Sequence, residues 1–249
     1  MVWLNPHWTS PAMNDLTTFT PGSFVHALTL LFCLAISACV FWAGRLNEGH
    51  FTPTHRLRVA IVTACVLSWA LSSGYLLQPS QFRWDLSLPL HFCNLANLIG
   101  AWAAWTRHRD AQAICYYWAL GLCSWAFLTP SLEVGPARVW FWFFWFYHLM
   151  ILVVLVQVLL LDHFRPNWRD FRRALAVSLA YMALLAVIDA ISGWNYGFVG
   201  RGKPLQVSPI DVFGPYPWRV FVMALIGSGV FAILTLPWVI QWRKLRRPF

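Results

Sequence analysis

Three side chains that could carry out chemistry lie within otherwise apolar stretches of the sequence. His91 and Cys93 stand at the start of one such stretch, in the run Leu-Pro-Leu-His-Phe-Cys-Asn, and His148 lies in the middle of another. Ionisable groups within a membrane segment are costly, so they usually face the protein interior or a water-filled cavity. These residues predict a polar pocket inside a bilayer, and Cys93, His148 and His91 are the candidate catalytic residues.

Cys93 is the candidate nucleophile. Pro89 suits the first position of a helix, where its missing N–H costs nothing, and the free amides of the next turn attract negative charge. A thiol close to such a helix end ionises more readily than an ordinary one. The alternative is that Cys93 packs as a small apolar residue, as we expect of the other five cysteines, whose spacing matches no zinc or disulfide framework.

A base for Cys93 has to come from another segment. His91 and Cys93 are two residues apart, which separates them by about 200° around a helix. His148 is the candidate base, although counting from Arg138 places it roughly 15 Å into the bilayer and so deeper than Cys93. The alternative is a neutral His148 that bonds a neighbouring helix.

Other polar residues are candidates for binding a substrate. His91 and Asn94 share a helix face at a spacing of three residues, and Asn94 and Asn97 repeat it. This stripe either lines the pocket or joins helices to each other. Asp189 is solvated, orients a histidine or pairs with Lys203. The candidate substrate-binding residues are His26, Asn94, Asp189, Asn195, Tyr196, Lys203, Asp211 and Trp218.

The composition is that of an integral membrane protein. Of the 249 residues, 59% are hydrophobic and 11% are charged, whereas soluble domains carry roughly 25% charged residues. Each apolar segment is close to the ~20 residues that cross a bilayer as a helix. We predict an all-α integral membrane protein with about seven transmembrane helices, in a single polytopic domain over residues 1–249. The segments are residues 24–43, 59–77, 88–106, 111–129, 138–161, 172–192 and 217–240.

The net charge of +9 does not indicate nucleic-acid binding, because the basic residues are distributed as in a protein that crosses a membrane several times. Alternate connections between the segments hold 13 basic residues on one side and 5 on the other. This positive-inside pattern predicts an outside N-terminus and an inside C-terminus. It places the start of the third helix and the long loop 193–217 on the outer side. We expect no cleavable signal, because the first 22 residues contain no Lys or Arg.

Known motifs for metal, phosphate or serine chemistry are absent from the sequence. It contains no His-Glu-x-x-His, no Gly-Lys-Ser/Thr phosphate loop and no Gly-x-Ser-x-Gly elbow. We therefore expect no metal and no cofactor.

Several short pieces together resemble the YwaF-like family of bacterial multi-pass membrane proteins, a family without an assigned function. They occur in the family's order and cover about residues 85 to 240. The pieces are Leu88-Pro89-Leu90-His91-Phe92-Cys93-Asn94, Leu128-Thr129-Pro130, His148 followed by Ile151, Asp189, Asn195-Tyr196-x-Phe198, Lys203-Pro204, Ser208, Asp211 and Gly214-Pro215-Tyr216-Pro217-Trp218. The resemblance implies a multi-pass protein of a bacterial cell membrane.

The family is distantly similar to a eukaryotic membrane transacylase that moves polyunsaturated acyl chains between phospholipids through a cysteine and a histidine. His148 matches that histidine by its place in the fifth helix. The cysteine of the eukaryotic relative falls at Leu90, so Cys93, one turn further on, either replaces it or the thiol chemistry is absent. The chain also departs from the bacterial pattern at Asn94, often Asp there, and at Arg219, often Tyr.

Three functions stay open on this basis. The first is a lipid acyltransferase or hydrolase at the outer leaflet, with Cys93 as nucleophile, His148 as general base and membrane lipid as substrate. The second is a non-enzymatic transporter that uses His91, Asn94, His148 and Asp189 as ligand or proton sites. The third is a membrane assembly protein that makes contact through its outer loop, and its protein partners are unknown.

Overall fold

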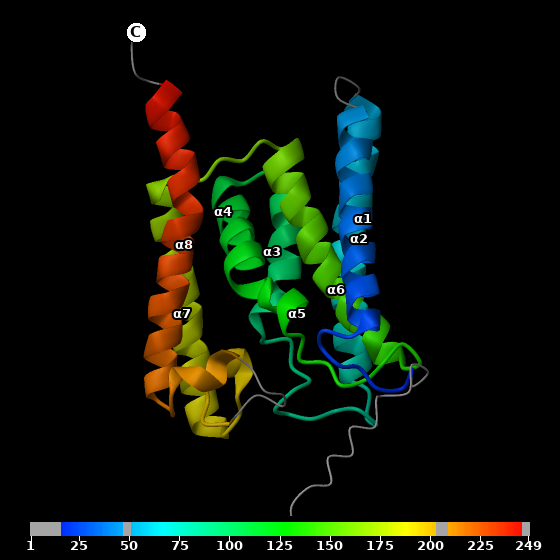
Figure 1. Ribbon diagram of the computed structural model, residues 1–249, viewed down its shortest axis with the longest axis vertical. Helices are drawn as coiled ribbons and strands as arrows, with labels where there is room; N and C mark the ends of the chain where they lie inside the picture. Colours follow the sequence, from blue (N-terminus) through cyan, green and yellow to red (C-terminus); the bar gives the residue numbers. More distant parts are fainter. Residues whose placement is uncertain (1–15, 47–50, 203–208, 246–249) are drawn as a thin grey trace, which may run out of the picture.

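The long helices of this chain run side by side in a single bundle (Figure 1). The computed structural model describes residues 16–46, 51–202 and 209–245, and these residues are helical apart from loops and one β-bridge between Thr18 and Val134. The helices are α1 Phe24–Leu46, α2 Phe51–Leu76, α3 Phe92–Thr106, α4 Arg109–Trp118, α5 Trp125–Leu128, α6 Val139–Val156, α7 Trp168–Ser192 and α8 Trp218–Leu245, with short π or 3₁₀ turns η1 Ala119–Cys123, η2 Gln157–Leu161, η3 Tyr196–Phe198 and η4 Pro209–Phe213.

Six helical segments among the described residues are long and apolar enough to cross a membrane. They are Phe24–Leu46, His55–Leu76, Arg109–Leu128, Val139–Leu161, Trp168–Ser192 and Trp218–Gln241. This confirms the prediction of an all-α, multi-pass architecture. The start of α1 and the end of α8 lie at opposite ends of the bundle (Figure 1).

The third predicted segment, residues 88–106, is shorter than expected. The helix α3 has 15 residues, or about 22 Å at 1.5 Å per residue, and it begins at Phe92 instead of Pro89. His91 caps it with extended backbone. The residues before it do not join the helix, because tyrosines bond their backbone groups. Tyr196 Oη accepts a hydrogen bond from Leu88 N, and Tyr181 Oη donates one to Leu90 O.

The fourth predicted segment, residues 111–129, is not one regular helix. After α4 the chain widens into the π-helical turn η1 and then forms the single turn α5. Gly121 in η1 lies against α8, where a Cβ atom would stand 2.7 Å from the Phe231 ring. The absence of a side chain at Gly121 lets α8 pack close to η1.

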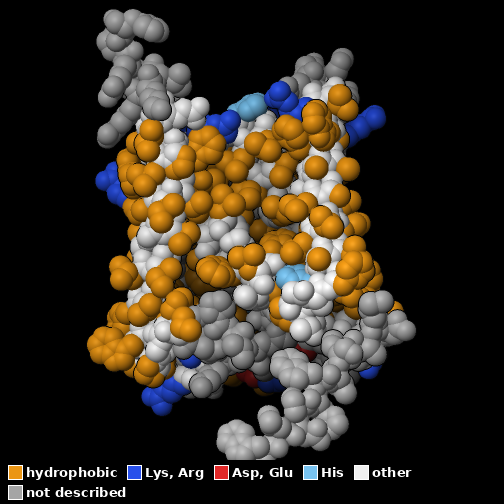
Figure 2. Space-filling view, in the orientation of Figure 1, with side chains coloured by type: hydrophobic (Ala, Val, Ile, Leu, Met, Phe, Trp, Pro, Cys, Tyr) orange, Lys and Arg blue, Asp and Glu red, His pale blue; other side chains and the backbone are white. Residues whose placement is uncertain are grey.

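Apolar side chains cover most of the face of the bundle seen in Figure 2, and basic side chains gather toward its two ends. Many large apolar residues are more than half exposed, among them Phe24 and Leu31 on α1 and Phe221 and Leu225 on α8. In water such a surface would drive aggregation. In a bilayer it faces lipid chains, which is the environment that the helix lengths also require.

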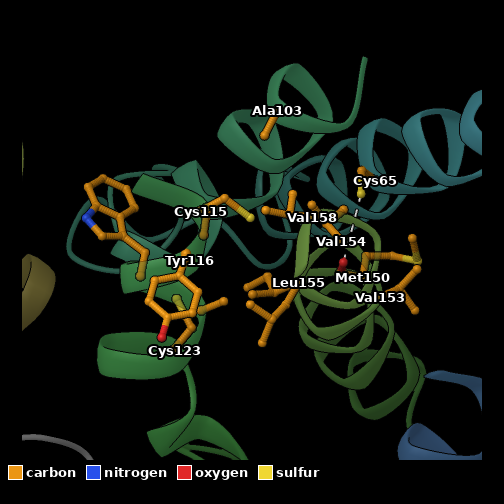
Figure 3. Packing of buried hydrophobic residues seen from close by; sticks show 14 of the residues in the cluster. Cys65, Ala103, Cys115, Tyr116, Cys123, Met150, Val153, Val154, Leu155 and Val158 are labelled. Carbon is orange, nitrogen blue, oxygen red and sulfur yellow. Dashed lines mark hydrogen bonds between the residues drawn. The ribbon is translucent and has the colours of Figure 1, made fainter. Parts of the chain in front are cut away.

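The protein core lies where α3, α4 and α6 meet. Cys115 and Cys123 approach α6 beside Leu155, and Cys65 on α2 donates a weak bond to Met150 O (Figure 3). Small residues such as Ala103 on α3 let the helices come close together. Four of the five other cysteines are therefore small core residues, as predicted, while Cys39 is exposed on α1.

One end of the bundle is fastened by a buried carboxylate, and we call it the Asp162 end. Asp162 follows η2, its side chain is fully buried, and it pairs with Arg58 of α2 at 2.6 Å and with Arg107 after α3 at 3.2 Å. Gln157 adds a bond to the same carboxylate. Arg58 also donates to Ala104 O of α3, so this end joins α2, α3 and α6 at one level.

The opposite end, which we call the loop end, carries the segment 193–217. Here Tyr196 Oη donates to Trp84 O at 2.7 Å while it accepts from Leu88 N. Burial raises the pKa of Tyr196 to about 12, so its hydroxyl stays protonated and can make both bonds. Phe19 packs in the same region, bonded through its amide to Glu133 O.

Removal of the Asp162 carboxylate should destabilise the bundle strongly. Asp162→Ala leaves the Arg58 guanidinium buried without its counter-charge, and breaking such a pair costs about 3–5 kcal/mol. Asp110→Ala is the matched control, because Asp110 pairs with Arg173 at an exposed site and such pairs contribute roughly 0–1 kcal/mol. Unfolding of both variants in the same detergent measures the difference. Equal losses would mean that Asp162 does not hold this end together.

Candidate functional site

Cys93 is the second residue of α3 and is half-buried. Asn94 and Leu95 amides turn back to His91 O, whereas the amides of Phe92 and Cys93 make no hydrogen bond to any described residue. Because the helix begins at Phe92 and not at Pro89, Cys93 lies closer to the free amides than the sequence suggested.

His148 lies on the tenth residue of α6 and is 2% exposed. Its ring packs on Tyr147 and Phe144, with centroids 4.1 and 4.3 Å away. Nδ1 lies 2.8 Å from Phe144 O. A carbonyl oxygen only accepts, so Nδ1 carries the proton of this bond, and in the neutral ring Nε2 keeps a free lone pair. That is the form a general base needs.

The structure brings Cys93 and His148 together from different helices. The Cys93 side chain lies next to both the His148 imidazole and the Cys123 thiol, close enough for each to act on its charge. His91, the residue that caps α3, also lies close enough to act on Cys93 through its charge. The interpretation that a base must come from another helix is consistent with this arrangement.

The two helices place Cys93 and His148 at one depth because they are aligned from the Asp162 end. Cys93 lies thirteen residues before Thr106, the last residue of α3, and His148 lies thirteen residues before Leu161, the last residue of η2. Each is thus about 20 Å from that end. The depth difference expected from the sequence disappears when both helices are counted from the Asp162 end, because α3 has 15 residues whereas α6 and η2 have 18 and 5.

Two residues of this site escaped the sequence analysis. Cys123 ends the π-helical turn η1 and is fully buried against Cys93. Tyr147 lies beside His148, and its phenol acts electrostatically on both Cys93 and Cys123. Single-turn π segments are frequent at functional sites, but nothing in the sequence marked η1 as one. Tyr147 could have been noticed because it precedes His148 directly.

Asn97 ties the two sides of the site to each other. Its Nδ2 donates to Tyr147 O at 3.0 Å on α6 and to Cys93 O at 3.4 Å on its own helix, and its Oδ1 accepts from Ser68 Oγ on α2. Asn97 is 1% exposed. Of the two interpretations of the asparagine stripe, Asn97 joins helices. Half-buried Asn94 has no such partner among the described residues and can face the pocket.

His91 links the site to the loop end. Its Nδ1 accepts a bond from Gly197 N at 3.3 Å, and its ring packs on Tyr196 and Phe198 at centroid distances of 5.1 and 5.7 Å. Gly197 has a φ of +62°, a conformation that suits glycine. Since Nδ1 accepts, Nε2 of the neutral ring carries the proton and could donate a hydrogen bond to a substrate oxygen.

His26 is buried and bonded at both ring nitrogens. Nδ1 accepts from Gly22 N at 2.9 Å and Nε2 lies 3.0 Å from Phe127 O. Its ring also packs 5.7 Å from Trp145. These bonds fasten the segment before α1 to the turn after η1. They leave His26 without a free nitrogen for a ligand.

The loop residues predicted to bind substrate have different surroundings. Asp189 is 2% exposed and its Oδ1 accepts from Tyr196 N, while Oδ2 is buried without a partner among the described residues. It neither bonds a histidine nor is solvated. Asn195 Oδ1 accepts from Gly200 N, and Trp218 is 67% exposed at the start of α8. Lys203 and the side chain of Asp211 lie outside the described residues.

The arrangement offers a thiol, an imidazole base, free helix amides and a phenol in one place. No three His, Cys, Asp or Glu side chains of the described ranges are grouped so as to hold a metal ion. The chemistry available to these side chains alone is nucleophilic attack by sulfur with proton transfer through the imidazole.

Loss of the Asn97 amide should loosen the site. Asn97→Ala removes the hydrogen bonds that join α2, α3 and α6, and the carbonyl oxygens of Tyr147 and Cys93 lose the donor that Asn97 supplies. This should lower the free energy of unfolding by about 1–3 kcal/mol. Asn94→Ala, one turn away on the same helix, should change it by no more than about 0.5 kcal/mol. Thermal unfolding of the purified variants in one detergent compares them. A loss of the same size for Asn94→Ala would contradict the joining role of Asn97.

Comparison with known proteins gives one assignment. No curated protein and no solved structure matches the chain. A family model matches residues 19–235, which include every described residue of the site. The chain belongs to the TMEM164 family of multi-pass membrane proteins.

Proposed function

We propose that this protein is a membrane acyltransferase or lipid hydrolase that forms an acyl-thioester on Cys93. The observation that carries the proposal is the proximity of the Cys93 thiol to the buried His148 imidazole. A histidine beside a cysteine inside a membrane bundle can serve as the base that removes the thiol proton.

The steps follow from the atoms present. His148 Nε2 takes the proton of the Cys93 thiol, and the thiolate attacks the ester carbonyl of a lipid. The carbonyl oxygen becomes negative and can be bonded by the free amides of Phe92 and Cys93. The C–O bond then breaks, the lysolipid oxygen receives the proton from His148, and the acyl group stays on sulfur. A lysolipid hydroxyl or water, deprotonated by His148, removes it.

Several neighbours suit this role. The bond of His148 Nδ1 to Phe144 O fixes the tautomer in which Nε2 is the base. The Cys123 thiol can donate a weak bond to the Cys93 sulfur. His91, with a protonated Nε2 at the loop side, can bond an oxygen of the substrate.

The finer topology is part of the same proposal. With α3 counted as a seventh pass, the chain has its N-terminus outside and its C-terminus inside a bacterial cell membrane, and the site opens toward the outer leaflet. The arginines at the Asp162 end, among them Arg58 of α2, Arg107 and Arg109, favour this orientation. The YwaF-like motifs and the distant likeness to a eukaryotic lipid transacylase favour membrane lipid as the substrate.

A transporter is the second candidate, and Asp189 is the observation in its favour. This carboxylate is buried, with one oxygen unpaired and no cation beside it among the described residues. Buried acids of this kind can carry protons or cations in transporters. Uptake into proteoliposomes that depends on Asp189 and not on Cys93 would favour transport over acyl transfer.

The acyl-enzyme can be tested with a phospholipid that carries an alkyne-tagged acyl chain. The label should become attached to Cys93 through a bond that hydroxylamine cleaves, and Cys93→Ala should remove it. His148→Gln should slow labelling by about 10²–10⁴-fold, because general-base catalysis has that size.

Cys39→Ser is the matched control, since Cys39 is exposed on α1 and should not affect labelling. Label that stays on the protein in the Cys93→Ala variant would overturn the proposal. Adding a lysolipid acceptor separates the two reactions, because a transferase passes the tagged chain to it and a hydrolase releases a free acid.

A further inference from the structure

Arg219 is a buried charge at the end of a membrane-spanning helix. It is the second residue of α8, in the candidate span Trp218–Gln241. Its neighbours Trp218 and Phe221 are 67% and 65% exposed, whereas Arg219 is 5% exposed. The Arg219 side chain therefore points into the protein at the level where a bilayer has its headgroups.

Among the described residues, only neutral groups bond the Arg219 guanidinium. Nη2 donates to the carbonyl oxygens of Gly200 and Gly202, and to Asn195 Oδ1 at 3.4 Å. No carboxylate of the described ranges forms an ion pair with it, and its Nε is buried without a hydrogen-bond partner there. Burial of a charge that lacks a counter-charge costs several kcal/mol, and an unsatisfied buried donor requires an explanation.

We propose that Arg219 holds a phosphate group, supplied either by a phospholipid headgroup or by free phosphate. Phosphate oxygens accept strong charge-assisted bonds, and a planar guanidinium suits them better than any other side chain. The anion supplies the missing negative charge and gives Nε a partner. Phospholipid phosphates are abundant at the depth of residue 219, the second residue of the α8 span.

The site adjoins the candidate catalytic site but does not depend on it. Arg219 holds the segment 195–202, whose Tyr196 and Gly197 contact His91. The proposal applies equally to an acyltransferase and to a transporter, so its test involves no turnover.

Native mass spectrometry of the purified protein measures binding directly. Wild type is mixed with phosphatidylglycerol or with diacylglycerol of the same chains, which lacks only the phosphate-bearing headgroup. Wild type should retain phosphatidylglycerol at least about ten-fold better than diacylglycerol, since bonds to a charged group are worth that much in affinity. A parallel titration with inorganic phosphate, with and without lipid, distinguishes the two sources of the phosphate.

Three variants localise the site. Arg219→Gln should lower phosphatidylglycerol retention about ten-fold, and Arg219→Lys, which keeps the charge, should lower it less. Arg201→Gln is the matched control, because Arg201 belongs to the same loop but is exposed over the Tyr216 ring, and it should bind as wild type does. Thermal unfolding shows which variants keep their fold.

Two results would overturn the proposal. One is a wild type that retains diacylglycerol as well as phosphatidylglycerol and gains nothing from inorganic phosphate, a result that needs no variant. The other is a folded Arg219→Gln variant that binds both forms of phosphate as wild type does. Displacement of the lipid by inorganic phosphate, or binding of phosphate alone, would support the site and identify the free anion as an occupant.

Discussion

The position of the candidate site depends on the level at which α3 and α6 are joined. Arg58 bonds both Ala104 O at the end of α3 and the Asp162 carboxylate after η2. Cys93 and His148 each lie thirteen residues from this end, along α3 and along α6 with η2. Because the helical rise per residue is the same, the two side chains reach one depth. If one helix slipped by one residue, its side chain would move by about 1.5 Å in depth and turn by about 100° around the helix axis, away from its partner.

The fourth segment completes the site because it is irregular. The π-helical turn η1 ends with Cys123 beside Cys93, and Gly121 in the same turn lets Phe231 of α8 approach. A regular helix has a different register, so it would turn Cys123 away from α3. The packing of α8 and the position of the second thiol are therefore consequences of one local widening.

The sequence predicted the helical bundle well because a bilayer leaves few alternatives for long apolar segments. It also singled out His91, Cys93 and His148, since ionisable groups are rare within such segments. It misplaced the start of α3, because the bonds that hold Leu88 and Leu90 come from Tyr196 and Tyr181, far along the chain. Cys123 was missed for a similar reason: helical periodicity assumes the regular turn that η1 lacks.

The loop end combines two buried charges of opposite sign that do not pair with each other. Asp189 and Arg219 both bond the segment that follows α7, Asp189 through Tyr196 N and Arg219 through Gly200 O and Gly202 O. Had the two charges served only to hold this segment, a direct ion pair would have satisfied both at a lower cost of desolvation. Their separation instead leaves Asp189 Oδ2 near the end of α7 and Arg219 Nε near the start of α8 without a partner among the described residues. Polar groups kept apart in this way are suited to ligands that carry their own charge. Arg219, whose acceptors among the described residues are all neutral, suits an anion.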